Sequence, residues 1–146
     1  MKLEGTYKFN SAQAKVWEVL TNPRHLEKAI PGCETLEELE PGKYDATLKI
    51  GIAAVKGTYK GMAQVVDPQP PNRYRLIVEG GGNPGFVKGE ALIELSHQNQ
   101  TTVVSYQGEG QVGGLIAGVG QRLISGIAKM MVGQFFKQIG QELKAL

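Results

Sequence analysis

Six residues near the end of the chain match a nucleotide-binding pattern, from Gly108 to Gly113. In the pattern G-x-G-x-x-G, a glycine-rich turn joins a strand to a helix whose N-terminus holds a pyrophosphate. The segment does follow a predicted strand and precede a predicted helix. However, a dinucleotide site also needs a returning parallel strand and an acidic residue about 20 residues further on. No strand pattern follows the helix, so we reject a nucleotide site and expect these glycines to form a hinge at a cavity mouth.

Other residues with catalytic or metal-binding chemistry are scattered. Cys33 has no C-x-x-C companion, and His25 and His97 each stand alone beside a predicted turn, whereas a zinc site needs clustered ligands. No serine lies in a G-x-S-x-G turn, and Cys33 has no identifiable base. We therefore predict no metal ligand and no catalytic residue, and we expect Cys33 to be a small buried hydrophobe.

Acid–base chemistry would fall to the glutamates and tyrosines of the predicted strands. Glu90 and Glu94 alternate with the more apolar Ala91 and are expected to face solvent. Tyr59 and Tyr106 fall on predicted inward faces, where a buried hydroxyl needs a partner. The sequence leaves two roles open for these tyrosines: packing with a satisfied hydroxyl, or orienting the polar group of a ligand.

Four bases, Arg122, Lys129, Lys137 and Lys144, recur at intervals of seven, eight and seven residues and therefore share one ridge of a helix. Within residues 111–146, Glu142 is the only acid. The ridge is either a solvated helix face or a docking surface for an acidic partner or anionic lipid, at about 1 kcal/mol per base.

These bases are positioned by a long helix in the last third of the chain. From Val132 onward, apolar residues fall on one side at about 100° per residue, as in an ordinary amphipathic helix. Between Leu123 and Met131, apolar residues cover more than half of the circumference. We expect residues 115–131 to form the wall and lid of a cavity, and residues 135–146 to clamp the helix to a sheet.

Three glycines recur every seven residues on the same ridge as the bases: Gly126, Gly133 and Gly140. Glycine inside a helix costs about 0.5–1 kcal/mol relative to alanine. The pattern indicates either a close approach to this ridge or a bend in the helix.

The chain before residue 108 is predicted to form strands, because polar and apolar residues alternate between turn signals. The seven expected strands span residues 3–9, 34–39, 44–50, 55–66, 74–79, 86–95 and 101–107, and two short helices span 12–20 and 24–29. Short turns imply an antiparallel sheet. Wrapped around the long C-terminal helix, it makes an α+β helix-grip fold, and the absence of a repeat or linker predicts a single ligand-binding domain over residues 1–146.

Composition narrows the expected setting. The single cysteine cannot form an internal disulfide, and no leader-like segment precedes Gly5, which predicts a reducing cytoplasmic location. A net charge of +2 gives no support for nucleic-acid binding. Arg122 and Lys129 interrupt the apolar stretch 112–136, so we expect no membrane span and at most peripheral contact at the inner face of the membrane.

Several motifs give the chain a family resemblance. They are Gly5, Val16-Trp17 with Leu20, Asn22-Pro23, Ile30-Pro31-Gly32-Cys33, Gly57, Gly61, Pro70-Pro71-Asn72-Arg73-Tyr74, Gly85 with Gly89 and Ala91, Gly113-Gly114-Leu115-Ile116, and Phe135-Phe136. With these, the sequence resembles the family of the carbon monoxide dehydrogenase G-type accessory protein, within the START/Bet v 1-like (polyketide cyclase) superfamily.

The resemblance implies a sheet that grips the terminal helix around an apolar cavity. It also implies an accessory role beside molybdenum-containing carbon monoxide dehydrogenases and related hydroxylases, in recruitment to the membrane or in handling a quinone-like ligand. Many relatives continue into a tail with a membrane anchor. We expect no such anchor here, because the sequence reaches only Leu146.

Three functions remain open from the sequence. The first is a non-enzymatic carrier of a quinone- or lipid-like ligand without a covalent cofactor. Its expected lining is Trp17, Ile30, Tyr59, Leu76, Val78, Phe86, Ile93, Val104, Tyr106, Ile116, Leu123 and Ile127. The second is a polyketide cyclase- or hydrolase-like enzyme, which needs a polar pair in the cavity. The third is a docking or chaperone-like module that binds an acidic enzyme through the basic ridge.

Overall fold

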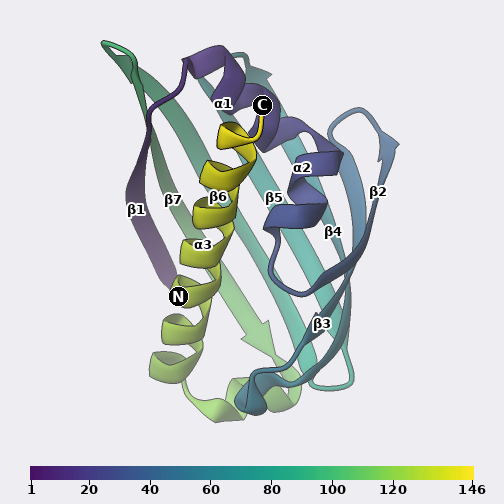
Figure 1. The fold of residues 1–146 in the computed structure, drawn as a ribbon. Helices are drawn as coiled ribbons and strands as arrows, with labels where there is room; N and C mark the ends of the chain where they lie inside the picture. The colour runs from purple at the N-terminus through teal and green to yellow at the C-terminus, as the bar shows by residue number, and fades with distance from the viewer.

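One antiparallel sheet of seven strands dominates the computed structural model, which describes residues 1–146 (Figure 1). The strands are β1 (Lys2–Phe9), β2 (Cys33–Glu40), β3 (Lys43–Ile50), β4 (Gly57–Gln69), β5 (Arg73–Gly82), β6 (Gly85–Gln98) and β7 (Thr101–Gly113). Their order in the sheet is β1-β7-β6-β5-β4-β3-β2. Strands β2 to β7 therefore form a meander, and β7 returns to pair with β1.

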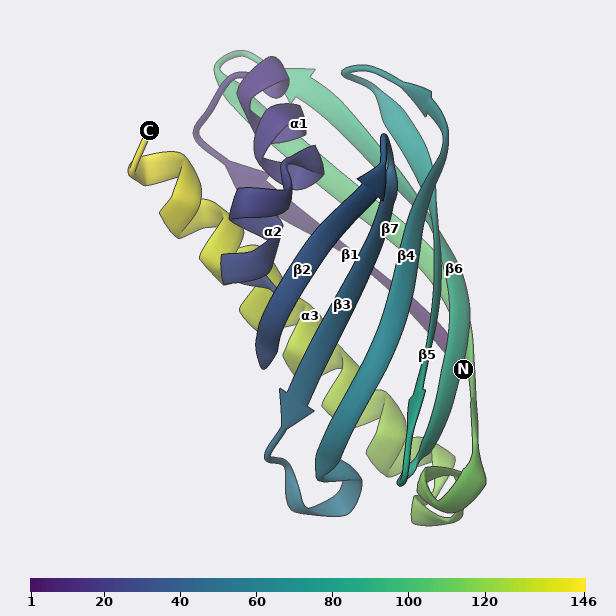
Figure 2. The ribbon, with the colours of Figure 1, turned by 90° about the vertical axis from the view of Figure 1, so that its right-hand side faces the viewer.

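Three helices and two 3-10 turns complete the fold. Helices α1 (Gln13–Thr21) and α2 (Pro23–Ala29) connect β1 to β2, and α3 (Gln121–Lys144) follows the last strand. The 3-10 turns η1 (Ala53–Val55) and η2 (Gly114–Val119) lie at the end of the molecule opposite α1. Figure 2 shows the sheet curling around α3, which crosses the concave face diagonally. This arrangement confirms the predicted helix-grip fold.

The break between α1 and α2 is set by two residues. Asn22 Oδ1 accepts a hydrogen bond of 2.9 Å from the backbone N–H of Arg24. Pro23 occupies the first helical position, where its missing N–H leaves no hydrogen bond unmade. The chain therefore starts a second helix at once, and the pair closes one end of the concave face.

The apolar core consists of two separate clusters. The larger, which we call the upper cluster, lies under α1, α2 and the C-terminal half of α3: Phe9, Val16, Val19, Leu20, Ala29, Tyr74, Ile93, Leu95, Val104, Phe136, Ile139 and Leu143. The smaller, lower cluster joins η1, η2 and the start of α3 to the sheet: Ile50, Val55, Tyr59, Ile116 and Ile124. Each half of α3 is therefore held by its own cluster.

The predicted hinge at residues 108–113 is wrong, because β7 continues to Gly113 and pairs with β6 along that whole stretch. The conformational freedom of glycine is used just beyond it. Gly114 has a φ of 75° and Gly120 a φ of 104°, a region that side chains disfavour. The chain thus leaves the sheet at Gly114, passes through η2, and starts α3 after Gly120.

The glycine ridge of α3 has two different surroundings. Cβ atoms placed on Gly133 and Gly140 would lie 3.6 Å from the Tyr7 hydroxyl and from the Phe9 ring, respectively. These two glycines therefore let α3 pack closely on β1. Gly126 has no other group within 4 Å of its Cβ position.

Candidate ligand-binding site

A belt of small residues crosses the concave face of the sheet between the two clusters. The register aligns Ala46 with Gly61, Gly61 with Gly80, and Gly89 with Gly110. The full belt comprises Ala46, Gly61, Ala63, Val78, Gly80, Gly89, Gly108 and Gly110, and none of these belongs to either cluster. Because glycine and alanine place almost no side chain above the sheet, the belt leaves room beneath the middle of α3.

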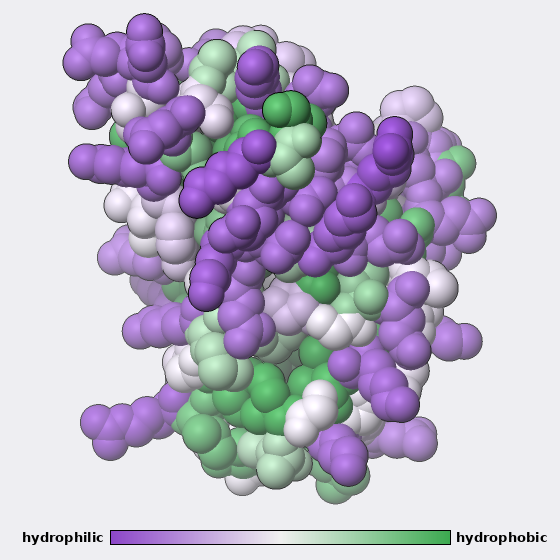
Figure 3. All heavy atoms as spheres, viewed as in Figure 1, coloured by the Kyte–Doolittle hydropathy of each residue, from purple (hydrophilic) through white to green (hydrophobic).

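Helix α3 does not fill that room. It approaches β1, α1, α2 and η2 closely but makes no comparable backbone approach to the middle strands β3–β6. Leu48, Leu76, Val87 and Ile127 border the belt and stay partly exposed, although the register turns the strand residues toward the concave face. Figure 3 shows a recess on this face, with apolar residues around its lower part. The recess and the belt form the candidate site.

Aromatic rings form the wall of the site on the β1 side. Tyr7 and Tyr106 both stack on Phe136, with ring centroids 4.4 and 5.7 Å away. A Cβ atom on Gly5 would lie 2.8 Å from the Tyr106 hydroxyl, so that glycine makes space for the Tyr106 ring. Burial, with the neighbouring Tyr7 as a second cause, raises the pKa of Tyr106. The hydroxyl therefore remains protonated at neutral pH and can donate a hydrogen bond.

The two tyrosines singled out in the sequence have different roles. Tyr59 donates a hydrogen bond of 2.6 Å to the Val55 carbonyl, so it is a packing residue with a satisfied hydroxyl. Its pKa is also raised by burial. Tyr106 makes no hydrogen bond within the protein, and its hydroxyl is free to meet a polar group of a ligand.

The structure distributes the predicted lining over both ends of the recess. Trp17, Leu76, Ile93, Val104 and Tyr106 belong to the upper cluster or pack against it. Tyr59, Ile116 and Ile127 do the same at the lower cluster. Val78 lies in the belt itself, Ile30 caps the end of α2, and Leu123 is 51% exposed at the start of α3.

Phe86 was predicted to line the cavity but lies on the outer face of the sheet. Its neighbour Val87 pairs with Val112 on the concave side, and alternation therefore turns Phe86 outward, where its ring covers Gly113 and is 54% exposed. The signal was in the sequence, because Phe86 shares its parity with Lys88 and Glu90.

A second depression, of about 860 Å³, opens on the outer face of the sheet. Its side chains come from outward positions of β2 to β6 and include Glu37, Asp45, Lys60, Glu79 and Lys88. Only four of its fourteen lining residues are hydrophobic. A wide polar depression is poorly suited to an apolar ligand, so the recess on the concave face remains the better candidate.

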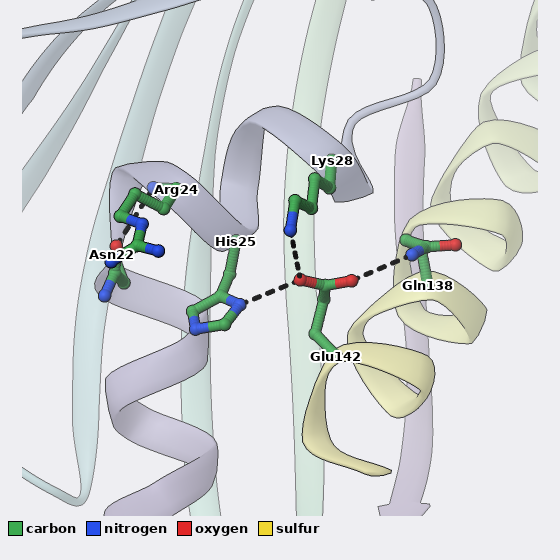
Figure 4. A network of polar contacts seen from close by, with 6 residues as sticks. All are labelled: Asn22, Arg24, His25, Lys28, Gln138 and Glu142. Carbon is green, nitrogen blue, oxygen red and sulfur yellow. Dashed lines mark hydrogen bonds and ion pairs between the residues drawn. The ribbon is translucent and has the colours of Figure 1, made fainter. Parts of the chain in front are cut away.

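Sequence reasoning missed a polar network that fixes the C-terminal end of α3. Glu142 is a buried carboxylate whose Oε1 lies 2.9 Å from Nδ1 of His25 and 3.8 Å from Nζ of Lys28 (Figure 4). Its Oε2 accepts a hydrogen bond of 3.0 Å from Gln138. The His25 hydrogen bond is the main cause of a lowered Glu142 pKa. Only the fold brings α2 and α3 together, and the sequence signal was limited to the four-residue spacing of Gln138 and Glu142.

All four bases of the predicted partner-binding ridge, Arg122, Lys129, Lys137 and Lys144, are exposed. None of them forms an ion pair. Separately, none of the helices combines the length and apolar character needed to cross a bilayer.

A curled antiparallel sheet that grips a C-terminal helix above a recess defines the START/Bet v 1-like class of folds. The chain matches a START superfamily protein from Mycobacterium smegmatis with a TM-score of 0.77 at 10% identity, over 99% of this chain and 97% of that one. It matches Ara h 8.0201 with a TM-score of 0.74 at 15% identity, over 100% and 99% of the two chains. At these identities the likeness shows the fold alone.

Within that class, residues 5–144 match the carbon monoxide dehydrogenase protein family CoxG, and the chain belongs to this family. A conserved protein from Geobacillus kaustophilus is 40% identical, with a TM-score of 0.96 over 99% of this chain and 96% of that one. Among curated proteins, none matches this chain. The family resemblance seen in the sequence is thereby confirmed.

Proposed function

We propose that this protein is a non-enzymatic accessory protein that holds a quinone- or lipid-like ligand between its sheet and α3. The observation that carries the proposal is the belt of small residues between two separate apolar clusters. An elongated apolar ligand beneath α3 would contact both clusters and bury surface that is now half-exposed. The unpartnered Tyr106 hydroxyl would donate a hydrogen bond to a carbonyl or headgroup oxygen of such a ligand.

Family membership supports a link to carbon monoxide dehydrogenase. The proposed partner is a molybdenum-containing enzyme of that type, and the proposed location is the cytoplasm, with peripheral contact at the inner face of the membrane. In this arrangement the accessory protein would carry its ligand between the bilayer and the enzyme.

Filling the belt tests the ligand site directly. Ala63→Leu and Val78→Phe add apolar atoms above the belt, whereas Gln64→Leu places an apolar side chain on the outer face of the same strand. We expect a short-chain ubiquinone to raise the melting temperature of the wild type and of Gln64→Leu, as any ligand that binds only the folded state does. In Ala63→Leu/Val78→Phe this shift should disappear, while the stability without ligand stays the same or rises.

Two results would count against the proposal. If the belt variants lost about 1–3 kcal/mol of stability without ligand, the space beneath α3 would already be filled, because overpacking carries that cost. If native mass spectrometry of protein from mild extraction recovered only empty chains that also failed to bind the ubiquinone, the carrier function would be wrong.

One alternative is favoured by a specific observation. The four exposed and unpaired bases of α3 fit a docking module that binds an acidic enzyme without carrying a ligand. The enzyme alternative has no comparable support, since neither Tyr59 nor Tyr106 hydrogen-bonds to a carboxylate or a histidine.

A further inference from the structure

Large apolar side chains are exposed at the end of the molecule formed by η1, η2 and the start of α3. Of the seven exposed large hydrophobic residues in the chain, four lie here: Phe86, Leu115, Leu123 and Met130. We call these four residues the apolar tip. Leu115 is 80% exposed, and Phe86 adjoins η2 because its ring covers Gly113. Such a concentration of exposed apolar surface marks an interaction site.

Nothing in the chain covers this end. Cβ atoms placed on Gly51, Gly118 or Gly126 would meet no other group within 4 Å. Leu123 and Met130 are seven residues apart and therefore lie on one ridge of α3, beside Gly126. The tip thus protrudes from the fold, and no groove of this chain receives it.

The charge at this end has one sign. Residues 50–58, 82–87 and 112–131, which make up η1, the β5–β6 turn, η2 and the start of α3, contain Lys56, Arg122 and Lys129 but no aspartate or glutamate. All three bases are exposed, and none forms an ion pair. The apolar tip is therefore flanked by uncompensated positive charge.

We infer that this end docks on the surface of an anionic phospholipid bilayer. The apolar tip enters the boundary between headgroups and acyl chains, and Lys56, Arg122 and Lys129 meet the lipid phosphates. A side chain as exposed as Leu115 needs a complementary pocket on a protein partner, whereas a deformable bilayer accepts it without one. The absence of acids selects an anionic surface over a neutral one.

Docking at this end would place the lower cluster and the recess beside the bilayer. The transfer of a lipid-like ligand along this path rests on the function proposed above. The docking itself does not, because binding to vesicles needs no ligand in the recess. The two proposals can therefore fail separately.

Sedimentation with vesicles tests the docking. The wild-type protein should partition onto phosphatidylcholine vesicles that contain phosphatidylglycerol and only weakly onto phosphatidylcholine alone. Arg122→Gln/Lys129→Gln should lower the partition coefficient about 25-fold, from about fivefold per base. Leu115→Ser/Leu123→Ser should lower it at least about tenfold, since two leucines no longer enter the apolar layer.

Matched controls separate this surface from the rest of the molecule. Lys137→Gln/Lys144→Gln removes two exposed bases from the other half of α3, and Leu39→Ser removes an exposed leucine from β2. Both controls should bind vesicles like the wild type, and all variants should keep the wild-type melting temperature.

Three outcomes would overturn the inference. One is equal binding of the wild type and the leucine variant, which indicates loose electrostatic adsorption. Another is equal loss in the controls, and the third is no binding to anionic vesicles, which leaves the basic ridge to an acidic protein. The shift in melting temperature with the short-chain ubiquinone, measured on Arg122→Gln/Lys129→Gln, reports the ligand site independently and should match the wild type.

Discussion

At the scale of single residues, Glu142 shows how a buried charge is kept in this fold. Burial alone would raise its pKa, but the hydrogen bond from His25 outweighs that effect and the pKa is lowered. Gln138 and Lys28 contribute in the same direction. A carboxylate held by three side chains from two helices fixes the position of α3 against α2 more specifically than apolar contact does.

We predict that Glu142→Gln lowers the free energy of unfolding by about 1–3 kcal/mol at neutral pH, because hydrogen bonds to a buried charge are lost. The folded-state pKa lies below the ordinary value, so the stabilisation is complete above that value. It is lost as the pH falls through the folded-state pKa. Urea unfolding at neutral and acidic pH should therefore show a difference between wild type and variant that shrinks in acid.

Glu90→Gln is the matched control, because Glu90 is an exposed carboxylate that pairs only with Arg75. It should change stability by less than about 1 kcal/mol. A Glu142→Gln variant whose deficit stayed constant down to acidic pH would show that the charge of Glu142 contributes nothing.

At the scale of elements, the start of α3 depends on backbone geometry. Gly120 is the N-cap of α3, with a φ of 104° and no side-chain cap. A side chain at this φ is strained, whatever space surrounds it. Gly118, two residues earlier, needs no positive φ and has open space at its Cβ position.

We therefore predict that Gly120→Ala costs about 1–2 kcal/mol of stability and that Gly118→Ala stays within about 0.5 kcal/mol of the wild type. Chemical denaturation of the two variants provides the comparison. Equal effects of both substitutions would mean that the strained turn before α3 is not set by Gly120.

At the scale of the whole molecule, the two clusters are unequal. The upper cluster contains twelve buried residues and the lower cluster five. Helix α3 crosses from one to the other above the recess, so its two halves are held by different amounts of buried apolar surface. Local stability follows such differences.

Hydrogen exchange should resolve this asymmetry. Backbone amides in residues 135–143 are expected to exchange at least about tenfold more slowly than those in residues 124–131, because the first set packs over the larger cluster. A short-chain ubiquinone should slow the second set selectively if it binds beneath that half. Uniform protection along α3 would contradict the division of the core.

The local elements could be predicted from the sequence because their signals are local. Alternation in β1 and β3, the Asn22-Pro23 break and the amphipathic pattern after Val132 indicated strands and helices that the structure confirms. The helix-grip fold followed from short turns and a long final helix. The same alternation turned Phe86 outward, and the predicted lining was wrong where this parity was not applied.

The tertiary structure alone decided features that depend on residues far apart in the chain. The belt exists because register aligns small residues from strands β3 to β7, and no single strand shows this in its sequence. The pairing of His25 with Glu142 joins residues 117 positions apart. The glycines between Gly108 and Gly113 extend a strand because β6 supplies their hydrogen-bond partners, whereas a glycine-rich sequence by itself fits a hinge equally well.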